Sequence, residues 1–178
     1  DVNSVESQGK TGTCWSYATA SFLESELMRM GRGEYDLSEM FVARNVYVEK
    51  ANKFVRRHGK TNFSEGSLSH DLINTINKYG LVPYNAFSGL VSDQKKHNHA
   101  ELSSVLGAYL DVIVDQKNPS VFWKEGYNAI LDVYLGELPE SFVFKGQTYT
   151  PLTFVKHLKL DTSDYINLTS FTHHPFYS

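Results

Sequence analysis

Apolar residues recur every three or four positions along most of the chain, which is the spacing of one apolar face on an α-helix. This spacing predicts helices over about 14–30, 40–57, 68–79, 102–113, 122–135 and 151–158. A short hairpin is expected to pair 142–144 with 148–149 across a glycine turn, and a loop with a further strand is expected over 161–170. The predicted fold class is therefore α+β, with helices in the majority.

Residues that start or stop helices stand at the ends of several of these segments. The first helix is followed by Gly31-Arg32-Gly33, which is typical of a left-handed cap. Ser38 precedes the second helix and can accept a hydrogen bond from its first turn. Gly80 ends the third helix, with Pro83 just beyond it, and Pro151 opens the sixth. These local signals support the predicted boundaries.

Composition and charge indicate a folded protein. The 178 residues are 41% hydrophobic and 21% charged, enough for one ordinary domain with a sizeable core. The net charge of -3, from 17 basic and 20 acidic residues, argues against nucleic acid as a main partner. No apolar run approaches a membrane span, and residues 1–4 do not resemble a signal peptide. A single cysteine fits a reducing compartment, so the cytoplasm is expected, with a periplasmic or secreted location as the alternative because no leader is visible.

The only cysteine, Cys14, stands where a glycine-containing turn gives way to the first predicted helix. The unpaired amides and the dipole of a helix N-terminus favour the thiolate, which is the nucleophilic form of cysteine. Gly9 and Gly12 leave room for the backbone to approach a substrate carbonyl. The side-chain amide of Gln8 and the backbone amide of Cys14 are then candidate donors to a developing oxyanion. A buried structural cysteine is the alternative, and the local pattern does not decide between the two.

Longer motifs resemble the papain-like cysteine peptidases, and more narrowly their bleomycin hydrolase and aminopeptidase C branch. The motifs are Gln8 with Gly12-Thr13-Cys14-Trp15, then Leu37–Met40, Glu65–Asp71, Lys78–Pro83 and, less sharply, Leu168–Phe171. The resemblance implies a papain-like fold, mostly its helical left lobe with additional helices and the hairpin, and an incomplete second, barrel lobe. It divides the chain into 1–91, the left lobe with the nucleophile; 92–160, a mainly helical insertion with the hairpin; and 161–178, the start of the second lobe.

The same resemblance implies roles for six residues. Cys14 would be the nucleophile, Gln8 the oxyanion donor, and Trp15 would pack beside the sulfur. The edge formed by Glu65, Gly66 and Ser67 would bind the substrate peptide in the manner of an added strand. Ser67 departs from the family pattern, which usually has a second glycine there, and this narrows the room for the substrate backbone.

The implied enzyme is a cysteine aminopeptidase that forms a thioester, acts on peptides with free N-termini and uses no cofactor or metal. Family members form closed oligomers, so a homo-oligomer, by resemblance a hexamer, is implied. Their base, a histidine followed by an asparagine, comes from the second lobe, and none of the seven histidines here stands in a matching context. The chain is therefore expected to be a fragment of the catalytic domain that hydrolyses peptides poorly by itself.

Two other functions stay open at this point. A non-catalytic peptide-binding or structural protein would keep the same lobe without turnover. Another thiol acyltransferase, such as a transglutaminase-like protein, would also place a cysteine at a helix start.

Two polar patterns are interpreted as solvent-exposed. His97 and His99 have a weak metal-ligand spacing, but no further ligands complete a site, so both are expected to be solvated. A charged cluster in the second helix is expected to form a solvated face; it comprises Glu49, Lys50, Lys53, Arg56 and Arg57.

Overall fold

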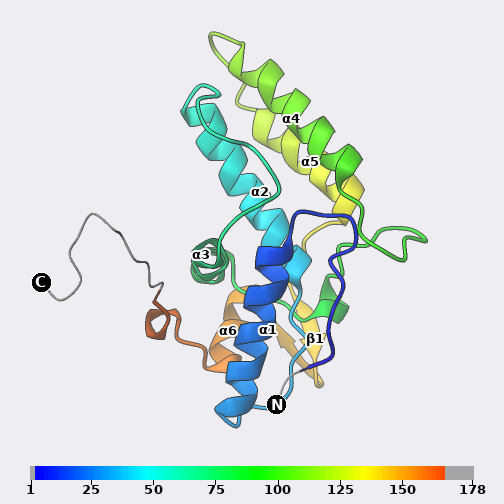
Figure 1. Ribbon diagram of the computed structural model, residues 1–178, viewed down its shortest axis with the longest axis vertical. Helices are drawn as coiled ribbons and strands as arrows, with labels where there is room; N and C mark the ends of the chain where they lie inside the picture. Colours follow the sequence, from blue (N-terminus) through cyan, green and yellow to red (C-terminus); the bar gives the residue numbers. More distant parts are fainter. Residues whose placement is uncertain (1–2, 167–178) are drawn as a thin grey trace, which may run out of the picture.

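The computed structural model describes residues 3–166, which form six α-helices, two 3₁₀ turns and one two-stranded sheet (Figure 1). In chain order the elements are α1 (Cys14–Arg29), α2 (Glu39–Arg56), α3 (Ser69–Tyr79), η1 (Tyr84–Ala86), α4 (Ala100–Val114), α5 (Trp123–Leu135), β1 (Phe142–Phe144), β2 (Gln147–Tyr149), α6 (Pro151–Leu158) and η2 (Thr162–Asp164). All six predicted helices and the hairpin are confirmed. Of the segment 161–170, residues 161–166 contain η2, and the predicted strand otherwise lies outside the described residues.

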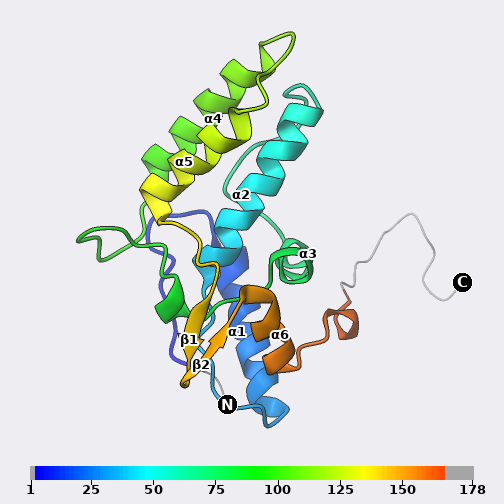
Figure 2. The ribbon, with the colours of Figure 1, turned by 180° about the vertical axis from the view of Figure 1, so that it is seen from behind.

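Helix α2 is the centre of the fold, in contact with α1, α3, α4 and α5. The paired helices α4 and α5 lie along α2 at one end of the molecule, while α1, α6 and the hairpin gather at the other (Figures 1 and 2). Because neighbours surround it, every residue from Glu39 to Tyr47 is buried, including Arg44. The Arg44 guanidinium pairs with Asp132 of α5, which provides a partner for a charge inside the protein.

The helix ends form as their sequence signals predict. The amide of Arg32 donates to Leu27 O at 2.9 Å and that of Gly31 to Met28 O at 2.9 Å, with Gly31 at φ +67°, so α1 ends in a Schellman motif. Ser38 Oγ accepts from Phe41 N at 3.0 Å and caps α2.

Four apolar residues that the spacing placed on helix stripes lie instead on the surface, one of them Leu152 in α6, which is 49% exposed. The other three, Met30, Leu68 and Phe122, stand at the flanking positions of α1, α3 and α5 and are 36%, 63% and 66% exposed. The spacing extended each of these three stripes by one residue because periodicity alone does not mark where a helix stops.

The hairpin and α6 form a small aromatic layer beside α3. Strands β1 and β2 are antiparallel, with Phe142 opposite Tyr149. The rings of Phe142, Phe144 and Tyr149 surround the fully buried Phe154 of α6, with ring centroids 5.1–5.7 Å from it. This layer gives the two short strands the apolar partner that an isolated hairpin lacks.

Neither a membrane-spanning helix nor a metal cluster occurs in the described part of the chain. None of its helices is long and apolar enough to cross a bilayer. Residues 3–166 also contain no group of three or more His, Cys, Asp or Glu side chains placed to hold a metal ion.

Candidate active site

Cys14 is the first residue of α1, and it is exposed. Thr13 before it is fully buried, so the peptide that enters the helix is anchored in the core while the thiol faces outward. The amides of Ser16 and Tyr17 both donate to Thr13 O, but the amide of Cys14, in the first helical position, has no intrahelical acceptor. The predicted placement of an accessible thiol at a helix N-terminus is therefore confirmed, and a buried structural cysteine is excluded.

Gln8 belongs to a closed turn, residues 8–13, that leads to Cys14; because Cys14 is the predicted nucleophile, we call it the nucleophile turn. Its Nε2 donates to Thr11 O at 2.5 Å, and Thr11 Oγ1 donates back to Gln8 O at 3.0 Å. A primary amide carries two N–H groups, so this turn holds the half-buried Gln8 side chain with one of them and leaves the other for a ligand.

Glu65 joins the nucleophile turn to the edge that precedes α3. Its carboxylate accepts a hydrogen bond from Gly12 N, and its backbone carbonyl accepts one from Trp15 Nε1 at 3.0 Å. A Cβ at Gly12 would stand 2.9 Å from Glu65 Cβ, so only glycine permits this approach. Glu65 and Trp15, both expected to serve the substrate side, are thus used to hold Cys14 against the 65–67 edge.

Gly66 and Ser67 continue this edge on the surface. Gly66 is exposed, and a Cβ there would meet nothing within 4 Å, so the space beside its backbone is open. The hydroxyl of Ser67 donates to Asp71 Oδ2 in the first turn of α3. From the other side, Lys50 Nζ donates to Ser64 O at 2.8 Å and to Gly66 O. Side chains of α2 and α3 therefore fix the edge from both ends.

The prediction that His97 and His99 are solvated is wrong. They are only 6% and 2% exposed, because their segment packs against the turn that leads to Cys14. Lys10 N donates to His97 O at 2.8 Å, and His99 N donates to Lys10 O at 3.1 Å. Gly9 has φ +64°, and a Cβ there would lie 2.4 Å from His97 O. A two-bond backbone pairing thus buttresses the start of the nucleophile turn.

Burial keeps both histidines neutral. His99 Nδ1 lies 3.0 Å from the Tyr47 hydroxyl, and its Nε2 has no partner within the described residues. Burial, with a smaller contribution from neighbouring His97, lowers the pKa of His99 to about 4, and burial also lowers the pKa of His97. The sequence offered no signal for this, because a histidine flanked by polar residues has the same local pattern on a surface.

Acid should therefore destabilise the protein through His99. Because the pKa of His99 is lower in the folded state than the roughly 6.5 of an unfolded chain, the unfolded state binds more protons between these values. The stabilising effect of neutral His99 is present above pH 6.5 and is lost as the pH falls toward 4, by about 3 kcal/mol. Urea unfolding of the wild type and His99→Gln at several pH values measures this loss as the difference between the two proteins.

The comparison with His99→Gln is needed because Glu39 makes the wild-type protein more stable, not less stable, as the pH falls. Burial raises the pKa of Glu39 to about 8, so its protonated form stabilises the fold below about pH 4.5 and this contribution is lost as the pH rises through 8. A wild-type minus variant difference that is flat from pH 7 to 4 would contradict the assignment of the acid sensitivity to His99.

No histidine forms a hydrogen bond with Cys14 among residues 3–166. His70 lies in α3, is about half exposed and has Asp71 Oδ1 3.6 Å from its Nε2. His97 and His99 are sealed in the core, and His173 and His174 lie outside the described residues. The described part of the chain thus contains an exposed thiol at a helix start, but no histidine that is hydrogen-bonded to it.

The comparisons with known proteins relate the chain to a solved structure by shape. No protein-family profile matches the sequence, and no curated protein matches it significantly. PepW from Lactobacillus rhamnosis HN001 matches with a TM-score of 0.66 and 21% sequence identity, over 92% of this chain and 46% of PepW. The chain thus spans about half the length of PepW. Over nearly its whole length, it has the fold of the corresponding part of PepW.

Proposed function

We propose that this chain is the nucleophile-bearing part of a papain-like cysteine peptidase of the bleomycin hydrolase and aminopeptidase C type. One observation carries the proposal: Glu65 accepts hydrogen bonds from both Gly12 and Trp15, which lie on either side of Cys14 in the chain, and it directly precedes Gly66, the open position of the 65–67 edge. A peptide paired with that edge presents its carbonyl to the helix start. The shared fold with PepW supports the same assignment.

The chemistry follows from the atoms at this helix start. The thiolate of Cys14 adds to the peptide carbonyl carbon, and the carbonyl electron pair moves to oxygen, which in this proposal accepts hydrogen bonds from the Cys14 amide and from the second N–H of Gln8. Collapse of this intermediate breaks the C–N bond, the amine leaves with a proton, and a thioester remains. Water then adds to the thioester, the acid is released and the thiol is restored.

The base that takes the Cys14 proton belongs, in this proposal, to polypeptide outside residues 3–166. No histidine among residues 3–166 hydrogen-bonds to the thiol, and the chain spans 46% of PepW. Turnover is therefore expected from a larger assembly, while binding of a carbonyl group at Cys14 is testable on this chain alone.

A peptide aldehyde tests the oxyanion site, because its carbonyl accepts the thiol reversibly and forms a tetrahedral adduct. We expect calorimetry to show binding that Cys14→Ser abolishes and that Gln8→Ala weakens roughly tenfold or more, since one oxyanion donor is lost. Alkylation of Cys14 by iodoacetamide forms no oxyanion, so its rate constants in the wild type and in Gln8→Ala should agree within about twofold. Gln116→Ala, which removes an exposed glutamine at the end of α4, is the matched control.

The same experiment separates the alternatives. Aldehyde binding that Cys14→Ser leaves unchanged would show that no adduct forms with the thiol, which would contradict the peptidase and favour a non-catalytic peptide-binding protein. Aldehyde binding that depends on Cys14 but tolerates Gln8→Ala would contradict the proposed oxyanion site and favour another thiol acyltransferase.

A further inference from the structure

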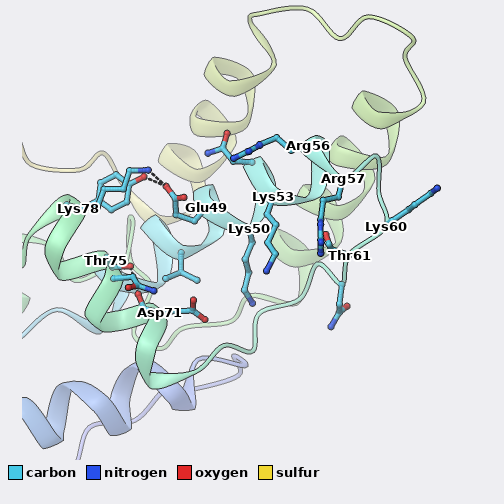
Figure 3. Close-up of a pocket in the computed structure, with 15 residues that line it drawn as sticks. Glu49, Lys50, Lys53, Arg56, Arg57, Lys60, Thr61, Asp71, Thr75 and Lys78 are labelled. Atoms are coloured by element: carbon cyan, nitrogen blue, oxygen red, sulfur yellow. Dashed lines mark hydrogen bonds and ion pairs between the residues drawn. The ribbon is translucent and has the colours of Figure 1, made fainter. Parts of the chain in front are cut away.

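A large basic cavity lies between the second half of α2, the segment 57–62 and α3 (Figure 3). Its volume is about 990 Å³, and we call it the basic pocket. Its lining includes six cationic side chains: Lys50, Lys53, Arg56, Arg57, Lys60 and Lys78. Two acidic residues, Glu49 and Asp71, also line it, which leaves an excess of four positive charges in a protein whose net charge is -3.

The two acidic residues do not neutralise the main group of cations. Glu49 binds Lys78 Nζ at 2.6 Å and the Tyr79 hydroxyl, and Asp71 accepts the hydroxyl of Ser67. Four cations, namely Lys53, Arg56, Arg57 and Lys60, form no hydrogen bond or ion pair with any part of the chain between residues 3 and 166. The prediction of a solvated charged face is thus correct for Lys53, Arg56 and Arg57, which are exposed, but Glu49 and Lys50 are half-buried and hydrogen-bonded, and the face lines a cavity.

Lys50 connects the basic pocket to the active-site edge. Its half-buried ammonium lies between the carbonyls of Ser64 and Gly66, and Gly66 is the open position of the edge. Lys50, Lys53 and Arg57 extend from α2 in the same direction, toward the segment that leads to this edge (Figure 3). A chain bound along Gly66 and continuing past Ser64 would therefore pass over unpaired cations.

We propose that the basic pocket binds acidic side chains of a peptide held on the Gly66 edge, so that the site selects peptides with carboxylates next to the segment at Cys14. This inference rests on the proposed function and names the substrate class for it.

The spacing of the cations matches an extended peptide. Lys53 lies in the last turn of α2 and Arg57 is the C-cap of this helix, four residues later and a rise of about 6 Å, and Lys50 extends the row to about 10 Å. Side chains on one face of an extended peptide repeat every 6 to 7 Å or so, so two carboxylates at alternate positions meet Lys53 and Arg57 together. Arg57 offers the fork of N–H groups that suits a carboxylate.

The test uses two fluorescent octapeptides, one with glutamate at alternate positions and one with glutamine in their place. Binding to Cys14→Ser, which cannot react, is measured by anisotropy at low and high salt. We expect the glutamate peptide to bind about tenfold more tightly than the glutamine peptide at low salt, with the preference shrinking at high salt.

Charge reversal locates the preference. Lys53→Glu with Arg57→Glu should abolish it, whereas Lys95→Glu with Lys96→Glu, two exposed lysines of the 92–96 loop, should leave it unchanged. Lys53→Gln with Arg57→Gln removes the charges without adding like-charged neighbours and should give the same loss, provided that circular dichroism shows the fold intact. Binding at Cys14 of a peptide aldehyde without acidic side chains should stay unchanged in both pocket variants, which separates this inference from the proposed function.

Three results would overturn the inference. The first is equal affinity for the two peptides, and the second is an equal loss of preference in the Lys95 and Lys96 variant. The third is that tripolyphosphate binds the basic pocket as tightly as the glutamate peptide does but does not displace that peptide. This would show that the basic pocket is a general anion site and that the peptide binds elsewhere.

Discussion

Replacing Gly80 with alanine is expected to lower the free energy of unfolding by about 4 kcal/mol or more, which places it among the most destabilising single substitutions. Gly80 ends α3 at φ +84°, where an L-residue is strained. An added Cβ would also stand 2.2 Å from the carbonyl carbon of Pro151 and 2.5 Å from Leu152 N. These are backbone atoms held by the Leu81 N to Pro151 O bond of 3.1 Å, so no side-chain rotation relieves the overlap.

Gly31→Ala is the matched control for this prediction. Gly31 also has a positive φ, +67°, but a Cβ there would meet nothing within 4 Å. Only the backbone conformation is strained, and a cost of about 1 kcal/mol is expected. Urea unfolding followed by circular dichroism measures both variants. If the two variants lost equal free energy of unfolding, the close approach of Gly80 to the backbone of Pro151 and Leu152 would add nothing to the cost of the positive φ. That result would contradict the packing of α3 against α6 described above.

The second large effect is expected at Glu65. Glu65→Ala leaves the Gly12 amide without its acceptor and frees the nucleophile turn from the edge. We expect about 1–3 kcal/mol of lost stability and a roughly 10- to 100-fold weaker peptide aldehyde adduct, because a small displacement of the attacking atom is costly. Calorimetry with the aldehyde, together with urea unfolding, measures the two effects separately.

Glu65→Gln distinguishes positioning from charge. A glutamine oxygen can still accept from Gly12 N, so most of the aldehyde affinity should return even though the charge is gone. Glu140→Ala, at an exposed position after α5, is the control for removing a carboxylate elsewhere. If Glu65→Gln were as defective as Glu65→Ala, the carboxylate would act through its charge, and the hydrogen bond to Gly12 would not be what positions Cys14.

The fold was largely predictable because its elements depend on local signals. These signals act within a few residues of one another, and each element formed as expected. They include the spacing of Leu23 and Leu27, the glycine after α1, the cap at Ser38 and the proline at position 151. The arrangement around α2 was not predictable in this way. Its first half reads as one apolar stripe, yet all of Glu39 to Tyr47 is buried, since four helices pack on it.

For the candidate site, the sequence by itself determined the position of Cys14 at a helix start, because a helix boundary and its unpaired amides follow from residues close in the chain, whereas the exposure of its thiol was decided by the tertiary structure. Only the tertiary structure decided the role of Glu65, the burial of His97 and His99, and the grouping of α2 cations into a pocket beside Gly66. Each of these depends on atoms more than fifty residues apart or on the packing of separate helices, and such contacts leave no periodicity or spacing in the chain.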